Sequence, residues 1–494
     1  MQWIVPFTGL VNDETTAHTV RKELTMSTLK QKYIGDKNFY KRVLMLALPI
    51  MIQSGITNFV GLLDNIMVGR VGTDQMSGVA IANQLIFVFN LAIFGAISGA
   101  GIFGAQFFGR GNNEGVRYAF RFKLMVCAVF TVLAIVIFII FGEPLLSAFI
   151  NNESEVGDPV KTLYYGKQYL TIMLIGLIPF AIKESYAGTL KETGETVVPM
   201  LSGIAAVVVN LIFNTILIFG YLGAPKLGVV GAAIATVLSR FVELGIVVWW
   251  THRHKERNPF IVGALRSLYI PKHLVKQMII KGLPLTINET LWAGGTSMML
   301  QAYSLRGLQV VAAYNISSTV SNLFNVVFLS LGSAIGILVG QLLGANKLEE
   351  AVEQDRKMIV FSVFSCFIVG TVMAVIAPLF PMIYKTEDAV RELARNFLFV
   401  SAAFMPVYAF SHASYFTMRS GGKTFVTFLF DSCFVWTVSV PLAYCLSRFT
   451  DLPIIPLFII CQMTEFVKCT IGYILLKKKV WVQNIVMDSK KVVE

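Results

Sequence analysis

Charged residues are scarce in this chain of 494 residues: they make up 14% of it, while apolar residues make up 55% and the mean hydropathy is +0.68. That balance excludes an ordinary soluble domain, in which roughly a quarter of the residues are charged. Cysteine and histidine are also few, at six and five. The cysteines form no CxxC pair and only His412 falls within a long apolar run, so neither a disulfide framework nor a cluster of metal ligands is predicted.

The apolar residues gather into twelve long runs, and about 20 apolar residues are needed for a helix to cross roughly 30 Å of hydrocarbon. The runs are continuous rather than alternating, which is typical of helices and excludes a membrane barrel of strands. We therefore predict an all-α integral membrane protein with twelve transmembrane helices. The expected spans are 43–69, 78–108, 122–141, 168–190, 197–220, 228–250, 278–304, 310–343, 358–384, 396–418, 424–447 and 454–476.

The net charge is +12, and the Lys and Arg residues that produce it fall mainly in the loops expected on one side of the membrane. If both termini are cytoplasmic, the segments on that side hold 30 of the 41 Lys and Arg residues and the opposite loops hold 9. This asymmetry follows the positive-inside rule and predicts cytoplasmic termini. The basic residues are therefore not interpreted as a nucleic-acid footprint.

The two halves of the chain align on each other without gaps at an offset of 235 residues. In this alignment "SGAGIFGAQFFG" matches "SAIGILVGQLLG", and Pro49 matches Pro284. Because each unit holds six helices, an even number, both units enter the membrane in the same sense. We predict two parallel six-helix bundles related by a pseudo-two-fold axis along the membrane normal.

The domain boundaries follow from this repeat. We expect a cytoplasmic tail at 1–40, an N-terminal lobe at 41–250, a cytoplasmic linker at 251–277, a C-terminal lobe at 278–476 and a second cytoplasmic tail at 477–494. The linker is rich in charge, which is why the boundary is placed there.

Ionisable residues inside a membrane span are costly and are functional candidates by default. Two carboxylates, Asp64 in span one and Glu289 in span seven, have no oppositely charged neighbour at helical spacing. The repeat places Met299 opposite Asp64 and Ser54 opposite Glu289, so the carboxylates are not copies of one ancestral residue. This favours two distinct roles.

Other intramembrane charges have local explanations or remain open. In two cases an acidic and a basic residue lie three positions apart, as neighbours on one helix face, and we interpret them as structural ion pairs. They are Arg240 with Glu243 and Glu465 with Lys468. For Asp431 the sequence leaves a structural and a functional role open, and for His412 a packed or hydrogen-bonded role is favoured over a cavity role.

Span five carries two amides, Asn210 and Asn214, four residues apart and thus on one helical face. Span six adds the hydroxyl of Thr236. With a nearby carboxylate these groups would complete a small cation site, but paired Asn and Thr side chains also join membrane helices to each other. The residues alone leave both interpretations open.

Several motifs together resemble a known family. They are "LLDNIMVGRVG" after a proline in span one, "AQFFGRGN" at the end of span two, "NxxxN" before "ILIFG", "GxxGAAIAT", and a basic loop between two sets of six helices. In order and spacing, over about residues 40–480, they resemble the bacterial branch of the multidrug and toxic compound extrusion (MATE) family. The resemblance implies an antiporter, not an enzyme, that exports organic and often cationic compounds in exchange for H⁺ or Na⁺ by alternating access. We expect a multi-pass protein of the bacterial inner membrane, in contact with membrane lipids, with no cofactor and no nucleic-acid partner. A two-lobed site needs only a monomer, which is therefore the expected state.

The resemblance also suggests site residues. The coupling carboxylate of the family corresponds to Asp64, and its cation-site amides and hydroxyl correspond to Asn210, Asn214 and Thr236, which would hold Na⁺ if Na⁺ is the coupling ion. Several members have an aspartate where this chain has Asn214, a departure that leaves the ion open. Glu289 is similar to a span-seven glutamate of some bacterial members.

Aromatic residues make up 12% of the chain, and those facing a central cavity would hold flat organic cations by cation–π contact. We choose four as candidates: Trp292, Tyr303, Phe324 and Tyr408.

Three other functions were weighed. A flippase for lipid-linked saccharides of the same superfamily would be expected to have two more helices and a strongly cationic cavity. A major-facilitator carrier would have a GxxxD-R-x-G-R-R-like loop after span two, which "GRGNNEGVR" does not match. An integral-membrane enzyme would need clustered His, Asp or Cys near an interface, and only one histidine lies within a span.

Overall fold

The computed structural model describes residues 32–150, 158–384 and 386–487, and within these ranges it consists of helices and short connections without strands. Most of the predicted N-terminal tail lies outside the described residues. Six helices form the N-terminal lobe: α2 (Lys37–Gly69), α3 (Thr73–Gly109), α4 (Asn113–Ser147), α5 (Pro159–Glu192), α6 (Val197–Phe219) and α7 (Val229–Arg253).

Six further spans form the C-terminal lobe. Five are single helices: α8 (Lys272–Ser304), α9 (Leu308–Gly344), α10 (Leu348–Ile376), α11 (Asp388–Ser420) and α14 (Ile454–Lys477). The remaining span runs from Thr424 to Phe449, with a short α12 (Thr424–Phe428), two π-helical segments, η4 (Leu429–Cys433) and η5 (Val435–Ser439), and α13 (Val440–Phe449). Short 3₁₀ turns lie at η1 (Tyr221–Gly223), η2 (Pro259–Ile261) and η3 (Phe380–Ile383).

Twelve helical spans of the described residues lie where twelve spans are predicted. Among the described residues, eleven helices are long and apolar enough to cross a membrane; α8 has 33 residues, comparable in length, but Lys, Asn and Glu interrupt it and make it less apolar. One predicted boundary is wrong, because span nine was expected to reach residue 384 and α10 ends at Ile376. Pro378 and Pro381 follow, and proline removes the backbone donor that a continuing helix needs.

Local sequence explains several helix ends. Asp36 accepts a hydrogen bond from the amide of Phe39 at 2.8 Å, and Asn112 accepts one from Gly115 at 2.9 Å, so both act as N-caps. Helix α5 begins with the Asp158 cap followed by proline, and α6 is capped after Phe219 by Gly220, whose positive φ of 77° suits glycine.

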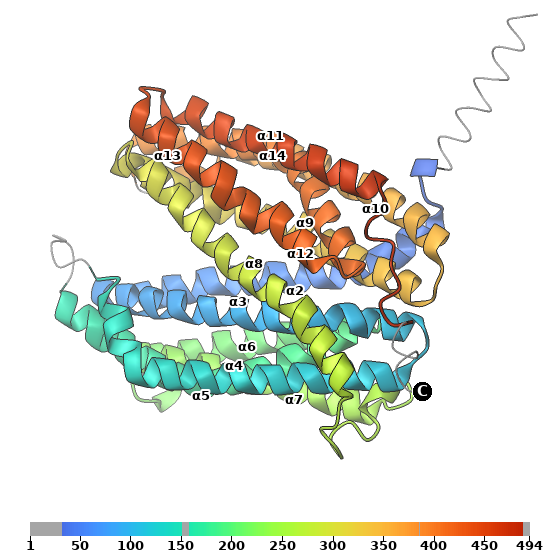
Figure 1. Cartoon of the computed structure of the whole chain (residues 1–494). Helices are drawn as coiled ribbons and strands as arrows, with labels where there is room; N and C mark the ends of the chain where they lie inside the picture. Colours follow the sequence, from blue (N-terminus) through green and yellow to red (C-terminus); the bar gives the residue numbers. More distant parts are fainter. Residues whose placement is uncertain (1–31, 151–157, 385, 488–494) are drawn as a thin grey trace, which may run out of the picture.

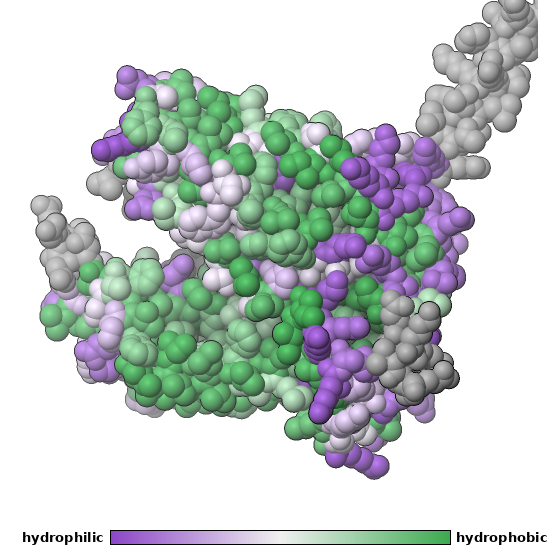
Figure 2. Space-filling model, in the orientation of Figure 1, coloured by the Kyte–Doolittle hydropathy of each residue, from purple (hydrophilic) through white to green (hydrophobic). Residues whose placement is uncertain are grey.

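The two lobes form a V (Figure 1). At the right of the view the lobes are in contact, at the ends where α3 and α9 finish and α14 leads to the C-terminus. At the left they separate, and the space-filling view shows a notch between them there (Figure 2). Apolar residues cover the bodies of both lobes, and hydrophilic residues gather on the right-hand end (Figure 2).

The closed end of the V is a reciprocal contact between the two repeats. A Cβ added to Gly109 of α3 would lie 1.9 Å from the main-chain oxygen of Gln341 in α9, and one added to Gly344 would lie 1.9 Å from that of Gln106. Both helices therefore cross with backbone against backbone, which only glycine permits. These four residues are the two pairs that the repeat alignment matches.

The C-terminal segment after α14 crosses this closed end. The side chain of Gln106 in α3 donates to Gln483 O at 3.2 Å and accepts from Ile485 N at 2.9 Å. Asn484 of the same segment donates to Gly344 O, in α9 of the other lobe, at 3.1 Å. The segment thus ties both lobes together where they touch.

Candidate functional site

Asp64 lies in α2, toward the end of the helix at the open side of the V. Its Oδ1 accepts a hydrogen bond from Asn214 Nδ2 at 2.5 Å. Asn214 Nδ2 also donates to Asn210 Oδ1 at 2.9 Å, and Asn210 donates to the hydroxyl of Thr236 at 3.3 Å. The four residues predicted from the sequence are therefore brought together as one chain of hydrogen bonds across α2, α6 and α7.

One oxygen of this hydrogen-bonded network has no hydrogen-bond partner among the described residues. Asn214 Oδ1 is buried and accepts no hydrogen bond from the residues that the structure describes, although a buried polar atom normally has a partner. It belongs to the side chain that also contacts the Asp64 carboxylate. Carboxylate, amide and hydroxyl oxygens are hard ligands that suit a small cation, and a carboxyl group can instead take up a proton. Chemically, the arrangement can hold either.

The site opens on a cavity of about 550 Å³ in the N-terminal lobe. Its lining includes Asp64, Asn210 and Thr236. Two lining residues were missed in the sequence, Tyr169 of α5 and Asn83 of α3; the Tyr169 hydroxyl interacts with Asn83 and Thr236. A tyrosine hydroxyl and an amide inside apolar spans are the signal that would have found them, because polar groups in hydrocarbon need partners.

The predicted ion pair within α7 is wrong. Glu243 pairs with Lys183 of α5 at 3.2 Å, and Lys183 also holds its neighbour Glu184 at 2.5 Å. Arg240 donates to Gly176 O at 3.0 Å and lies over the ring of Phe180. A helical spacing of three residues permits a contact on one helix, but here the neighbouring helix α5 offers better-placed partners.

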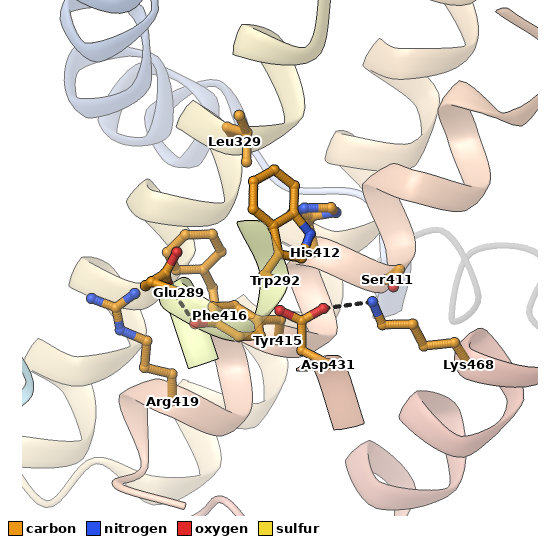
Figure 3. Close-up of a pocket in the computed structure, with 10 residues that line it drawn as sticks. All are labelled: Glu289, Trp292, Leu329, Ser411, His412, Tyr415, Phe416, Arg419, Asp431 and Lys468. Carbon is orange, nitrogen blue, oxygen red and sulfur yellow. Dashed lines mark hydrogen bonds and ion pairs between the residues drawn. The ribbon is translucent and has the colours of Figure 1, made fainter. Parts of the chain in front are cut away.

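A second polar cluster lies in the C-terminal lobe (Figure 3). Asn288 of α8 donates to Asp431 Oδ2 at 3.0 Å, and Asp431 Oδ1 pairs with Lys468 of α14 at 2.7 Å. Next to Asn288, Glu289 accepts a hydrogen bond from the Tyr415 hydroxyl at 3.1 Å. The predicted pair of Glu465 with Lys468 is present at 3.9 Å, but the shorter bond of Lys468 goes to Asp431.

The backbone at Asp431 is irregular. Asp431 lies in the π-helical η4, whose Ser432 donates from its amide to Asn288 Oδ1 at 3.2 Å and from its hydroxyl to Asn288 O at 2.7 Å. π-helical turns inside helices are frequent at functional sites. The cluster lines a pocket of about 190 Å³ together with Trp292 and His412 (Figure 3). His412 also contacts the carbonyl oxygen of Tyr408 at 3.1 Å.

The four aromatic candidates lie in different places. Trp292 is 38% exposed and lines the C-lobe pocket. Tyr303 is fully buried among other rings, with Tyr314 and Phe458 each 5.8 Å away between centroids, so it forms part of the lobe core. Phe324 and Tyr408 pack against a second core cluster, where the Tyr408 hydroxyl donates to Gln462 at 2.7 Å.

No group of three or more His, Cys, Asp or Glu side chains that could hold a metal ion occurs in the part of the chain that the structure describes. The N-lobe site instead combines one carboxylate with neutral oxygens.

Comparisons with known proteins give the family. The MatE family model matches the chain twice, over residues 49–216 and 284–445, so the two matches begin 235 residues apart, at Pro49 and Pro284. The probable multidrug resistance protein NorM of Thermotoga maritima is 24% identical over 455 residues, which cover 92% of this chain and 96% of that protein. The probable multidrug resistance protein YoeA of Bacillus subtilis is 25% identical over 443 residues, covering 88% and 93%.

Solved structures share the fold. A multidrug resistance MATE family transporter of the MOP superfamily, in an outward-facing conformation, superposes with a TM-score of 0.79 at 18% identity, over 90% of this chain and 97% of that one. A MOP superfamily transporter from Pyrococcus furiosus, for which reverse polarity of the binding pocket suggests a different function, gives 0.78 at 18% identity, over 91% and 97%. The predicted fold of two parallel six-helix lobes is therefore confirmed, and the chain belongs to the MatE family of multi-pass membrane transporters.

Proposed function

We propose that this protein is a secondary antiporter of the bacterial plasma membrane that exports organic, often cationic, compounds in exchange for H⁺ or Na⁺. The relatives named above as probable multidrug resistance proteins support the class of cargo. The observation that carries the coupling is the Asp64 carboxylate, which accepts a hydrogen bond from Asn214 beside an open cavity, while the side-chain oxygen of Asn214 is buried without a partner among the described residues.

In alternating access, the two lobes of the V would rock against each other, so that the open end closes and the closed end opens. With cytoplasmic termini, the closed end faces the cytoplasm and the notch faces outward. A cation or proton then reaches Asp64 from outside and is released inside after the lobes rock. Coupling requires that ion and cargo bind the two conformations with different affinity, because equal affinity shifts no equilibrium.

The Asp64 site serves either ion. One carboxylate and the neutral oxygens of Asn214, Asn210 and Thr236 would surround Na⁺ without a second negative charge. Protonation of Asp64 would neutralise the same site, and the carboxyl group would then donate a hydrogen bond instead of only accepting them. The chain's asparagine at position 214 lowers the negative charge of the site, which favours H⁺ over Na⁺.

The C-terminal lobe would contribute to cargo binding. Glu289 and Trp292 line one pocket, and a carboxylate beside an aromatic face suits an organic cation. Asp431 is already neutralised by Lys468, so Glu289 is the carboxylate of this pocket that remains for a cargo. A single chain holds both lobes and both sites, so a monomer suffices.

The test uses purified protein in proteoliposomes loaded with a fluorescent organic cation. A pH gradient and a Na⁺ gradient are imposed separately on wild type and on Asp64→Asn, with Asp74→Asn, at the start of α3, as a control for loss of an acidic residue. We expect one gradient to drive export by wild type and by the control, and export by Asp64→Asn to be lost. No gradient-driven movement of any organic cation would refute the antiporter, and lipid-linked saccharides would then be tested.

A further inference from the structure

A third pocket, of about 160 Å³, lies between the lobes near the closed end and is lined by α2, α3 and α5 from one lobe and α9 and α11 from the other. Its charged lining comprises two acids, Glu184 and Glu192, and two bases, Lys191 and Arg419. The rest is mainly apolar, including the rings of Phe94 and Phe416. The balance of charge depends on which of these groups already have partners.

Both acids have an ion-pair partner within their own lobe. Glu192 pairs with Lys123 at 2.5 Å, and this lysine is fully buried. Glu184 pairs with Lys183 at the same distance, and Lys183 also pairs with Glu243 at 3.2 Å. Gly101 and Gly104 make room for the Glu192 carboxylate, since an added Cβ would come within 2.6 and 2.2 Å of its oxygens. Glu192 is therefore held in place by α3 as well as by its lysine.

Both bases lack such partners. Among the described residues, no carboxylate oxygen comes within 4.0 Å of the charged nitrogens of Lys191 or Arg419. Arg419 Nη1 is buried and has no hydrogen-bond partner in the described part of the chain, which is unusual because buried polar groups are normally satisfied. The guanidinium lies between two rings, 5.5 Å from Phe94 and 5.4 Å from Phe416. The pocket therefore holds two cationic side chains that form no direct ion pair with a carboxylate of the described residues.

We propose that this pocket binds an anionic oxygen group, such as a carboxylate, that belongs to a compound with an apolar aromatic body. Arg419 and Lys191 would bind the oxygens, because charge-assisted hydrogen bonds to a carboxylate are among the strongest that side chains make. The rings of Phe94 and Phe416 would pack on the body. This inference rests on the proposed function and adds a second charge requirement to the cargo.

The size and position of the pocket indicate that it takes one end of a larger compound. Sites that enclose a drug-sized molecule measure roughly 300–1,000 Å³, whereas this one is about 160 Å³. Arg419 and Phe416 also line the pocket of Glu289, so the two pockets adjoin. A compound with an anionic group at Arg419 and a cationic group at Glu289 would occupy both.

The position of the pocket between the lobes would make the affinity for an anionic compound depend on whether the lobes are close together or apart. Lys191 belongs to α5 of one lobe and Arg419 to α11 of the other. An anion between them contacts both lobes only while they are close at this end. Rocking would separate the two cations and weaken binding, which is the differential affinity that transport requires.

The test compares two dyes that differ only at one group, a rhodamine with a free carboxylate and the methyl ester of the same rhodamine. Binding to the detergent-solubilised full chain is measured by fluorescence polarisation, so no ion gradient is involved. We expect wild type to bind the acid about tenfold more tightly than the ester, as one strong charge-assisted contact would give. Arg419→Gln and Lys191→Gln should each remove that preference, because binding of the acid weakens by about tenfold more than binding of the ester.

Two controls keep the result interpretable. Arg419→Lys keeps the charge and should keep part of the preference, and Lys276→Gln removes an exposed lysine elsewhere on the surface and should change nothing. Equal binding of acid and ester by wild type, or variants that weaken both dyes equally, would overturn the proposal. Gradient-driven export of the ester by wild type tests the proposed function separately, so the two failures can be told apart.

A lipid phosphate has the same anionic chemistry. Native mass spectrometry of the purified protein distinguishes this source. An anionic phospholipid that stays bound to wild type, is lost from Arg419→Gln and is not displaced by the acid dye would assign the site to lipid and overturn its role in cargo binding. Displacement of such a lipid by the acid dye, or no retained lipid, supports the cargo.

Discussion

The reciprocal contact at the closed end of the V predicts what a single methyl group would do. In Gly344→Ala the new Cβ would lie 1.9 Å from Gln106 O, whereas real Cβ contacts are essentially never under 3.0 Å. The two helices would have to move apart by about 1 Å at this point. Forcing extra atoms into a packed contact costs about 1 to 3 kcal/mol.

The cost falls on one conformation only. Gln106 and Gly344 belong to different lobes, so the clash exists while this end is closed and disappears when the lobes separate there. A shift of 1 to 3 kcal/mol changes the ratio of the two conformations by about 5- to 150-fold. Gly109→Ala should act in the same direction, because its Cβ would meet Gln341 O at the same distance.

The assay is accessibility of the inter-lobe pocket from the closed end. A cysteine replaces Ser333, which lines that pocket, in a chain whose native cysteines are replaced. Oriented vesicles are treated with a membrane-impermeant maleimide from the closed-end side. Labelling should be about 5- to 150-fold faster in Gly344→Ala than in the parent.

Gly245→Ala is the matched control, because an added Cβ at position 245 of α7 would meet nothing within 4 Å. If Gly344→Ala and Gly245→Ala label at the same rate, the reciprocal contact does not hold this end closed. Equal acceleration by both would point to a general loosening of the helices instead, and would refute the reasoning as well.

Three further outcomes are expected. Asp64→Asn should melt within a few degrees of wild type yet show no ion-driven export in proteoliposomes; ion-driven export at the wild-type rate would contradict its role. Arg121→Ala loses three hydrogen bonds of 2.8 to 2.9 Å to carbonyl oxygens of the linker between the lobes. The free energy of unfolding should therefore fall by about 3 kcal/mol, and the linker should become sensitive to protease. An unchanged cleavage pattern would show that Arg121 does not hold the linker. Lys468→Met leaves Asp431 buried without its cation at a cost of about 3 to 5 kcal/mol, and adding Asp431→Asn should recover part of the lost melting temperature; no recovery would mean that the ion pair is not the cause.

The repeat could be predicted from the sequence because its matches fall where the fold needs particular residues. Gln106 and Gly109 align with Gln341 and Gly344, and each glycine packs against the main chain of the other repeat's glutamine. The alignment predicts that these residues are equivalent. It does not predict that they touch, because contact depends on where the pseudo-two-fold axis passes.

Partners of buried charges were harder to predict for a related reason. Spacing of three or four residues identifies neighbours on one helix, and both ion pairs expected on that basis have their shorter bonds elsewhere. Lys468 reaches Asp431 on the preceding span, 37 residues away in sequence. Packing of helices decides such contacts, and a single sequence does not contain the packing.

The two lobes are alike in backbone and different in chemistry, and the difference has a physical use. Asp64 lies toward the open end of α2, whereas Glu289 lies in the middle of α8, so the two carboxylates stand at different depths. Symmetric carboxylates would respond alike to the rocking of the lobes and would bind the same ion twice. In the proposed mechanism, one carboxylate at each depth would let an ion be taken up in one lobe while a cargo is held in the other, and the shared closing contact would make both events depend on the same motion.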